Sequence, residues 1–523
     1  FFKKMKTPFS NQFNSGQDLK ENLVYTSKIC LDVSNIIEST LGPSGMDKLV
    51  IIDKDKKLIT NDGATILNSL KFSNPIAKIL VEISKSQDFE VGDGTTTVCL
   101  LAAELISSSK ILADEGFRLK DIITNFKKAA LISTHLLEKL SLRPIDKNLN
   151  SFKRLLISCC ATTLNSKLIS SKRHVFSEMI VDIALSVGEG FDRNLISVKT
   201  IIGGSLNDSF FFKGIGIKKP FAYAGFEKQK KKHYYPHVLL LDIELELKTE
   251  KSDSEAKINS ILKYKQFIDA EWSIIYEKLD KIIQSKAKIV FSKQSIGDLA
   301  TQFFSERGIF SGGRIPTDDL IKMQVGTGAT ILSTINEIPL FCLGKCEMVE
   351  EKQIGNERYI LLSGCLTGAY TIILRGNSQK LLDETKRCLN DGIMVVNKVL
   401  KNQRIVGGAG SIELKLSSKL RQYARTLTGK EQTILGKFAQ SLEIIPKILC
   451  KNSGLDQLKI LSALRAEHTK SESWSGIDVE NGKILDTIEK HIWEPLVIKT
   501  HAIQAATEAA CSILSIDSIF SDQ

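Results

Sequence analysis

The stretch Gly92-Asp93-Gly94-Thr95-Thr96-Thr97 stands directly before residues 98–105, whose apolar side chains recur at helical spacing. This pattern predicts a helix that begins among the threonines, with unpaired N–H groups and a partial positive charge facing the turn. Two glycines allow an anion to approach the backbone, and Asp93 suits a divalent metal bound to that anion. The stretch is typical of a nucleotide-phosphate site with its magnesium ligand. Taken alone, it is equally consistent with a glycine-rich turn capped by threonine.

A second acidic glycine turn, Asn61-Asp62-Gly63-Ala64-Thr65, precedes another predicted helix. Two short apolar runs, residues 49–52 and 58–60, flank a charged turn and predict a β-hairpin that leads into it. Each acidic turn alone could be a helix cap. Two such turns in one domain could bring the carboxylates of Asp62 and Asp93 to one metal–phosphate group.

Glycine-rich turns interrupt the chain at two further places. A predicted helix over residues 24–40 stops at Leu41-Gly42-Pro43-Ser44-Gly45, where Gly42 can adopt the left-handed C-terminal conformation. Much later, Gly407-Gly408-Ala409-Gly410 breaks the chain where a backbone could approach a ligand closely.

Asp391 lies on a predicted helix whose buried stripe includes Leu389 and Ile393. The aspartate is about 200° from Leu389 around the helix and points away from the stripe. It is therefore either a solvated surface residue or a group that faces a nucleotide cleft.

Length and composition bound the class of protein. A chain of 523 residues exceeds one hydrophobic core and predicts two or three domains. Its 42% hydrophobic and 25% charged residues are typical of a soluble globular protein, and no apolar run approaches the roughly 20 residues of a membrane span. The formal charge is +11, but scattered lysines without a basic-aromatic stripe argue against nucleic-acid binding.

The cysteines and the N-terminal residues indicate a cytoplasmic protein. None of the ten cysteines shows a C-x-x-C spacing, which predicts buried, reduced thiols. Residues 1–10 lack a continuous apolar run, so we expect no signal peptide, and Met5 is a candidate initiator.

The middle third of the chain differs from its ends. Apolar and acidic residues alternate over 241–247, which predicts a strand with one solvated face. A polar segment, 248–257, precedes a predicted amphipathic helix over 261–282 and a strand over 287–291. Both ends are mostly helical, so we predict a multi-domain α/β protein in which an α/β domain is inserted into a mainly helical one.

Five motifs in this order resemble those of a group II chaperonin subunit, and the resemblance covers nearly the whole chain. They are Leu41-Gly42-Pro43-Ser44-Gly45-Met46-Asp47-Lys48, Asn61-Asp62-Gly63-Ala64-Thr65-Ile66, Val91-Gly92-Asp93-Gly94-Thr95-Thr96-Thr97, Gly407-Gly408-Ala409-Gly410 and Trp493-Glu494-Pro495.

The resemblance implies three domains. A mainly helical equatorial ATPase domain would comprise residues 1–149 and 402–523, and an intermediate hinge domain residues 150–217 and 370–401. An apical α/β substrate-binding domain would span residues 218–369, with the polar 248–257 segment near a built-in lid.

The resemblance also implies residue roles. Asp93 would bind magnesium, and Asp62 and Asp391 would position and deprotonate the attacking water. The phosphate cradle would comprise Gly94, Thr95, Thr96 and Thr97. The other implied positions are Gly42 against the nucleotide, the γ-phosphate-sensing loop Asn165, Ser166 and Lys167, the adenine- and ribose-contacting residues Gly408, Ala409 and Glu494, and Lys499 one helical turn beyond.

The implied function is that of an ATP-dependent molecular chaperone with ATP/ADP and Mg²⁺ as cofactors. Its partners would be paralogous subunits in a hetero-oligomeric double ring and non-native client proteins, without nucleic acid or membrane, in the cytoplasm. One alternative is a ring scaffold that binds nucleotide with little hydrolysis of its own. Another is a small-molecule kinase of the actin–hexokinase type, which rests on the Asp-x-Gly-Thr motif alone.

Two residues depart from the family pattern. Ala409 stands where the family usually has the second of three consecutive glycines, which costs about 1 kcal/mol or more if its φ is positive. Gly392 replaces the usual alanine after Asp391, which loosens that helix by up to ~1 kcal/mol. Neither change removes a catalytic group, so we predict a working ATPase that both could slow.

Overall fold

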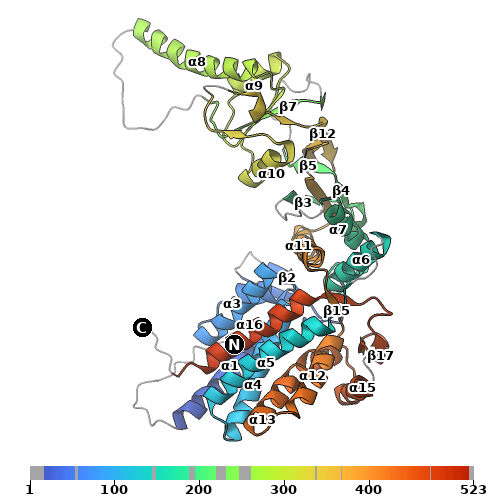
Figure 1. The fold of residues 1–523 in the computed structure, drawn as a ribbon. Coiled ribbons are helices and arrows are strands. Elements are labelled where there is room, and N and C mark those ends of the chain that lie inside the picture. Colours follow the sequence, from blue (N-terminus) through green and yellow to red (C-terminus); the bar gives the residue numbers. More distant parts are fainter. Residues whose placement is uncertain are drawn as a thin grey trace. The chain divides into compact units, whose positions relative to one another are not determined.

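The computed structural model describes residues 17–52, 57–143, 149–187, 195–219, 231–246, 261–335, 338–366, 368–470 and 473–517. The chain forms two compact units, Phe1–Val181 with Arg387–Gln523, and Asp182–Lys386 (Figure 1). Both chain ends belong to the first unit, and the middle of the chain forms the second. The finer division into three domains stays a prediction.

The first unit is mainly helical. Its helices are α1 Gln17–Glu38, α2 Gly63–Ser69, α3 Pro75–Glu90, α4 Thr95–Asp114, α5 Leu119–Leu140, α6 Leu149–Asn165, α12 Ser411–Ala424, α13 Lys430–Ser441, α14 Ile444–Asn452, α15 Gln457–Lys470 and α16 Leu496–Leu514. Helices α7 Arg173–Val187 and α11 Gln379–Asn402 cross the boundary between the units. Its strands are β1 Lys48–Ile51, β2 Lys57–Thr60, β15 Ile405–Gly407, β16 Ser475–Asp478, β17 Lys483–Asp486 and β18 Trp493–Pro495.

Helix α4 lies at the centre of the first unit and packs against α1, α3 and α16, which run beside it in Figure 1. By length and composition α4 could cross a membrane, but 78% of its most apolar stretch is buried inside the unit. A helix that is apolar on all sides and surrounded by other helices is a core helix. The helix that the Gly92–Thr97 stretch predicts is therefore the centre of the unit.

Two short strand pairs in the first unit lead into turns of the predicted site. Strands β1 and β2 form the predicted antiparallel hairpin, with Lys48 opposite Thr60; the turn at 53–56 lies outside the described residues. Strand β15 pairs with β18 so that Val406 lies opposite Glu494. The hairpin leads directly into the Asp62 turn, and β15 leads directly into the Gly407–Gly410 turn.

The second unit contains three sheets. A five-stranded sheet has the order β10-β7-β8-β9 with β11 on β7, a four-stranded sheet the order β5-β13-β12-β6, and a three-stranded sheet the order β3-β14-β4. The strands are β3 Ile196–Ile202, β4 Phe210–Phe212, β5 Gly214–Ile217, β6 Lys232–Tyr234, β7 His237–Leu241, β8 Ile289–Ser292, β9 Phe310–Gly312, β10 Ile331–Leu332, β11 Gly344–Lys345, β12 Met348–Ile354, β13 Glu357–Ser363 and β14 Tyr370–Gly376. Its helices are α8 Ile261–Gln284, α9 Asp298–Glu306 and α10 Thr317–Thr327.

The strand predicted over 241–247 is wrong over 242–246, and residue 247 lies outside the described residues. Strand β7 ends at Leu241 and comprises the continuous apolar run before it. Val238 and Leu240 belong to the core that includes α10, whereas Leu239 and Leu241 belong to the core that includes α8 and α9. Both faces of this strand are covered, so after His237 its sequence is continuously apolar and does not alternate. The predicted helix over 261–282 is confirmed as α8, and the polar 248–257 segment lies outside the described residues.

The cysteines are as predicted. All ten are free, and nine are buried, with Cys365 partly exposed. Burial raises the pKa of Cys99 and of Cys160 to about 12. These thiols are protonated core residues and not nucleophiles.

Candidate functional site

The Gly92–Thr97 turn has the conformation its sequence predicts. Gly92 and Gly94 have φ of +81° and +80°, which favours glycine. Gly94 is the N-cap of α4 and no side chain caps the first turn of the helix among the described residues. The Asp93 carboxylate accepts a hydrogen bond from the Gly94 N–H at 2.7 Å. The N–H groups that begin α4 are therefore available to an anion beside Asp93.

The Asp62 turn lies directly against the Asp93 turn. Asp62 caps α2 and accepts hydrogen bonds from the backbone N–H and the hydroxyl of Thr65, at 2.9 and 2.5 Å. Its other carboxylate oxygen accepts one from the Thr95 hydroxyl at 2.9 Å. A Cβ at Gly63 would lie 2.6 Å from the Thr96 hydroxyl, so only glycine fits at this contact. The two acidic turns predicted from the sequence are thus brought together.

Asp391 completes a group of three aspartates. It lies on α11, is 15% exposed, and forms an ion pair with Lys167, which is 9% exposed. Burial raises the pKa of Asp391 to about 8; Lys167 opposes this shift, and the carboxylates of Asp62 and Asp93 add to it. Of the two alternatives for Asp391, a solvated surface residue or a group that faces a cleft, the structure excludes the solvated surface residue.

Lys167 balances only part of the negative charge. Burial alone would lower the pKa of Lys167, but Asp391 and then Cys388, Asp93 and Asp62 raise it well above its usual range. Burial likewise opposes ionisation of Asp62, yet Lys167 and the bonds from Thr65 and Thr95 lower the pKa of that carboxyl. With Asp391 paired to Lys167, the carboxylates of Asp62 and Asp93 leave a net negative site that suits a further cation.

The loop that follows α6 approaches the aspartates through Lys167. The Asn61 amide donates to the Ser166 carbonyl at 2.7 Å and joins this loop to the Asp62 turn. The Asn165 side chain accepts a hydrogen bond from Arg173 at 2.6 Å. Asn165 and Ser166 therefore hold the shape of the loop, while Lys167 contacts the aspartate.

A second polar cluster surrounds Lys499 on α16. Its ammonium group lies 2.6 Å from Glu494 and 2.8 Å from Glu413, and all three side chains are largely buried. A Cβ at Gly408 would lie 2.7 Å from the Glu494 carboxylate, so the glycine turn approaches this cluster closely. Glu413 was not predicted. The only signal was an acidic residue between the apolar residues Ile412 and Leu414.

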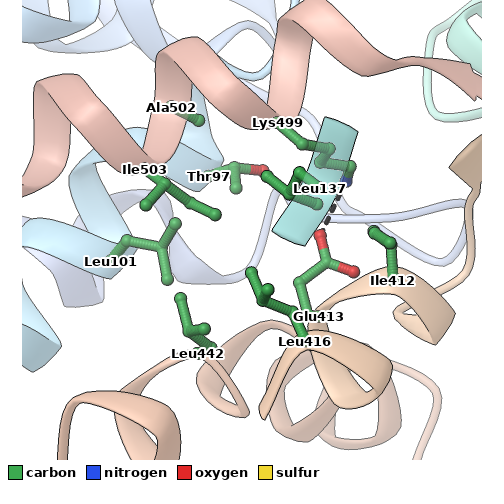
Figure 2. A pocket seen from close by; sticks show the side chains of 10 residues that line it. All are labelled: Thr97, Leu101, Leu137, Ile412, Glu413, Leu416, Leu442, Lys499, Ala502 and Ile503. Carbon is green, nitrogen blue, oxygen red and sulfur yellow. Dashed lines mark ion pairs between the residues drawn. The ribbon is translucent and has the colours of Figure 1, made fainter. Parts of the chain in front are cut away.

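An apolar cavity lies beside this cluster, between α4, α12 and α16 (Figure 2). The side chain of Thr97 faces this cavity with Leu101 and Ile503, and the Lys499–Glu413 pair lines it too (Figure 2). Thr97 would therefore contribute its backbone N–H to an anion at the helix N-terminus, and not its hydroxyl.

Gly42 and the Gly407–Gly410 turn contact the same leucine. Gly42 has the predicted positive φ, +85°, and its missing Cβ leaves room for the Leu449 side chain. A Cβ at Gly410 would lie 3.7 Å from the same side chain. Leu449 on α14 thus separates two of the predicted nucleotide-contacting turns, which lie in one neighbourhood.

A profile of the TCP-1/cpn60 chaperonin family matches residues 33–523 of this chain. The chain belongs to the TCP-1/cpn60 chaperonin family. It is 44% identical to T-complex protein 1 subunit eta of Arabidopsis thaliana over 502 residues, which is 95% of this chain and 90% of the relative. Its identity to the eta subunit of Homo sapiens is 42% over 496 residues, and to that of Saccharomyces cerevisiae 42% over 500, each covering 95% of this chain and 91% of the relative.

Within the family, residues 221–227, 269–272 and 442–446 resemble the eta subunit of the eukaryotic chaperonin TRiC, and these relatives confirm that similarity. Residues 221–227 lie outside the described residues. The chain is a chaperonin subunit, and the prediction from its five motifs is confirmed.

The first departure of this chaperonin subunit from its family, Ala409, is strained. Its φ is +53°, in the left-handed region that disfavours a side chain. The Ala409 carbonyl accepts a hydrogen bond from the Ile477 N–H at 3.1 Å, which helps to hold this conformation. Because φ is positive, we expect Ala409 to cost the first unit about 1 kcal/mol or more of stability relative to glycine.

Replacing Ala409 by glycine is expected to stabilise the first unit by about 0.5–1 kcal/mol, because relief of the left-handed strain exceeds the entropy cost of glycine. The unfolding midpoint in urea measures the change. Ala463, exposed on helix α15, provides the matched control, and Ala463→Gly should destabilise by about 1 kcal/mol. Destabilisation by both substitutions would contradict the strain at Ala409.

The second departure, Gly392, is accommodated by its neighbours. A Cβ at this position would lie 2.9 Å from the Ile180 Cδ1 and 3.2 Å from the Cys160 sulfur. The volume of the missing methyl group is therefore filled by side chains from α6 and α7. The close approach of these helices offsets part of the lower helix propensity of glycine beside Asp391.

Proposed function

We propose that this chaperonin subunit binds and hydrolyses ATP at the three aspartates, and that hydrolysis drives the folding of non-native proteins. The observation that carries the proposal is the convergence of Asp62, Asp93 and Asp391 on Lys167, beside the uncapped N-terminus of α4. Phosphoryl transfer to water requires an anion cradle, a divalent cation and a base that orients the water. The chain offers a group for each.

The residues divide by the part of the nucleotide that each would hold. Gly94 and the N–H groups of Thr95–Thr97 would bind phosphate, and Asp93 would hold Mg²⁺. Among the described residues no three ligating side chains form a ready-made metal cluster. A single carboxylate, that of Asp93, suits Mg²⁺, which is usually held by one or two carboxylates with phosphate oxygens and water. The ion, when bound, neutralises charge on the phosphates.

Asp62 and Asp391 would position and deprotonate the attacking water. Asp62 is fixed by three hydrogen bonds from Thr65 and Thr95, which suits an orienting group. Asp391 is largely buried beside the other two aspartates and is held by its ion pair with Lys167, which suits a carboxylate that accepts a proton from a bound water. Lys167, on the loop after α6, would sense the γ-phosphate through its ion pair with Asp391.

The nucleoside would lie toward Gly42, Gly408, Ala409, Glu494 and Lys499. Gly408 and Glu494 are in close approach, and Lys499 neutralises Glu494. A hetero-oligomeric double ring with paralogous subunits is part of the same proposal, and the relatives' names, which call each a subunit, support it. The three-domain division and the cytoplasmic location are proposed with it, on the resemblance to the family.

A second candidate is a ring scaffold that binds nucleotide with little hydrolysis of its own. The strained Ala409 at the nucleoside end favours it. The retention of all three aspartates favours hydrolysis.

Native mass and Mg²⁺-dependent ATP hydrolysis, measured on the chain isolated from its own cells, test the proposal. We expect a very large particle that contains several related chains of similar size and releases phosphate from ATP only with Mg²⁺. A particle built from one kind of chain would contradict the hetero-oligomer. A stable monomer would contradict the folding machine.

A further inference from the structure

Gln87 forms hydrogen bonds with the Asp93 turn through both its side chain and its backbone. This glutamine on α3 is fully buried, and its side-chain amide donates to the Asp93 carbonyl at 2.8 Å. Its backbone carbonyl accepts from the N–H groups of Val91 and Gly92 at 3.0 and 3.3 Å. A Cβ at Gly94 would lie 3.2 Å from the Gln87 amide nitrogen. One residue therefore touches the turn on both sides of Asp93.

His501 on α16 holds Gln87 in this orientation. Its Nδ1 lies 2.6 Å from the Gln87 side-chain oxygen. The Asp93 carbonyl can only accept, so the Gln87 amide nitrogen faces it and the amide oxygen faces His501. The His501 Nδ1 must then carry the hydrogen. Burial lowers the pKa of His501, with Lys398 in the same direction and Glu90 and Glu508 opposing, which favours the neutral ring with one N–H.

Helix α16 connects this contact to the other end of the site. Lys499, which pairs with Glu494, lies two residues before His501 on the same helix. Val91 of the turn and Ile498 of α16 also share one small apolar core. One helix therefore carries both Lys499, at the nucleoside end, and His501, which contacts Gln87.

We propose that Gln87 and His501 are positioning residues for the metal–phosphate turn. His501 orients the Gln87 amide, and Gln87 holds the Asp93–Gly94 peptide so that the carboxylate and the α4 N–H groups face one ligand. This inference rests on the proposed ATP site and goes beyond it by assigning two residues that do not touch the nucleotide. It predicts an effect on binding of Mg·ATP and not only on stability.

The test measures the affinity of the full chain for Mg·ATP by calorimetry, in the assembly in which it purifies. Gln87→Leu keeps the side-chain volume and removes both hydrogen bonds, and should weaken binding about tenfold, since an unpaired buried carbonyl lets the turn relax. His501→Ala should weaken it about threefold. His501→Asn places an amide N–H near the Nδ1 position and should restore affinity to within about twofold of the native chain.

The matched control is Ser108→Ala, which removes a buried 2.8 Å hydrogen bond to Ser441 in the core of the same unit. It should lower the unfolding midpoint and leave the affinity unchanged. Unchanged affinity in Gln87→Leu and His501→Ala would overturn the inference, as would equal losses in His501→Ala and His501→Asn or a loss in the control. If Gln87→Leu does not fold, the two His501 variants decide. A native chain that binds no Mg·ATP would instead overturn the proposed function, and the inference with it.

Discussion

Replacing Asp391 by asparagine is expected to reduce ATP hydrolysis by this subunit by about 100-fold or more, while Mg·ATP still binds. Loss of a positioned general base typically costs 10²–10⁴ in rate. Asparagine keeps the shape of the side chain and can still contact Lys167, but it cannot accept a proton. Single-turnover release of phosphate from bound ATP measures the rate, and calorimetry measures the affinity.

The matched control lies on the same helix. Asp383 is partly exposed and accepts a hydrogen bond from Gln379 at 2.8 Å. Asp383→Asn makes the same chemical change on α11 away from the three aspartates, so both rate and affinity should be unchanged. Unchanged hydrolysis in Asp391→Asn would contradict the role of Asp391. If the native subunit also turned over ATP only slowly, the ring-scaffold alternative would then be the better account.

Replacing Lys499 by methionine is expected to destabilise the first unit by about 3–5 kcal/mol, the usual cost of leaving a buried charge without its partner. The Lys499 side chain is 10% exposed, and it is the shared partner of Glu413 and Glu494. Burial raises the pKa of Glu494, with Lys499 opposing and Glu413 adding to the shift. Without the lysine, two buried carboxylates would face each other.

Tryptophan fluorescence during urea unfolding reports on this unit directly. Trp474 and Trp493 are both buried in it, and a Trp272→Phe background removes the third tryptophan, which lies in the second unit. The control is Lys451→Met, which breaks an ion pair to Glu38 whose lysine is 56% exposed, and should cost less than about 1 kcal/mol.

A second substitution separates charge from packing in the Lys499 variant. Adding Glu413→Gln to Lys499→Met removes one of the two unpaired carboxylates and should recover part of the lost stability. A midpoint for Lys499→Met equal to that of Lys451→Met would contradict a buried, shared charge at Lys499.

Local chemistry made the acidic turns and most helices predictable. Asp62 caps α2 and Gly94 begins α4 because capping residues and apolar periodicity act within a few residues of the chain. The prediction over 241–247 failed because the alternating residues follow the strand. The strand itself, β7, is the apolar run before them, and elements distant in the sequence cover both of its faces.

By itself, the sequence determined the chaperonin family and the two acidic glycine turns, and its resemblance to the family nominated Asp62, Asp93 and Asp391 as site residues. Only the tertiary structure decided that Asp391 meets Lys167, that Lys499 is shared with Glu413, and that His501 and Gln87 support the Asp93 turn. It also decided that Ala409 has a positive φ. The physical reason is distance along the chain: caps and periodicity depend on neighbouring residues, whereas these contacts join segments that meet only when the helices pack.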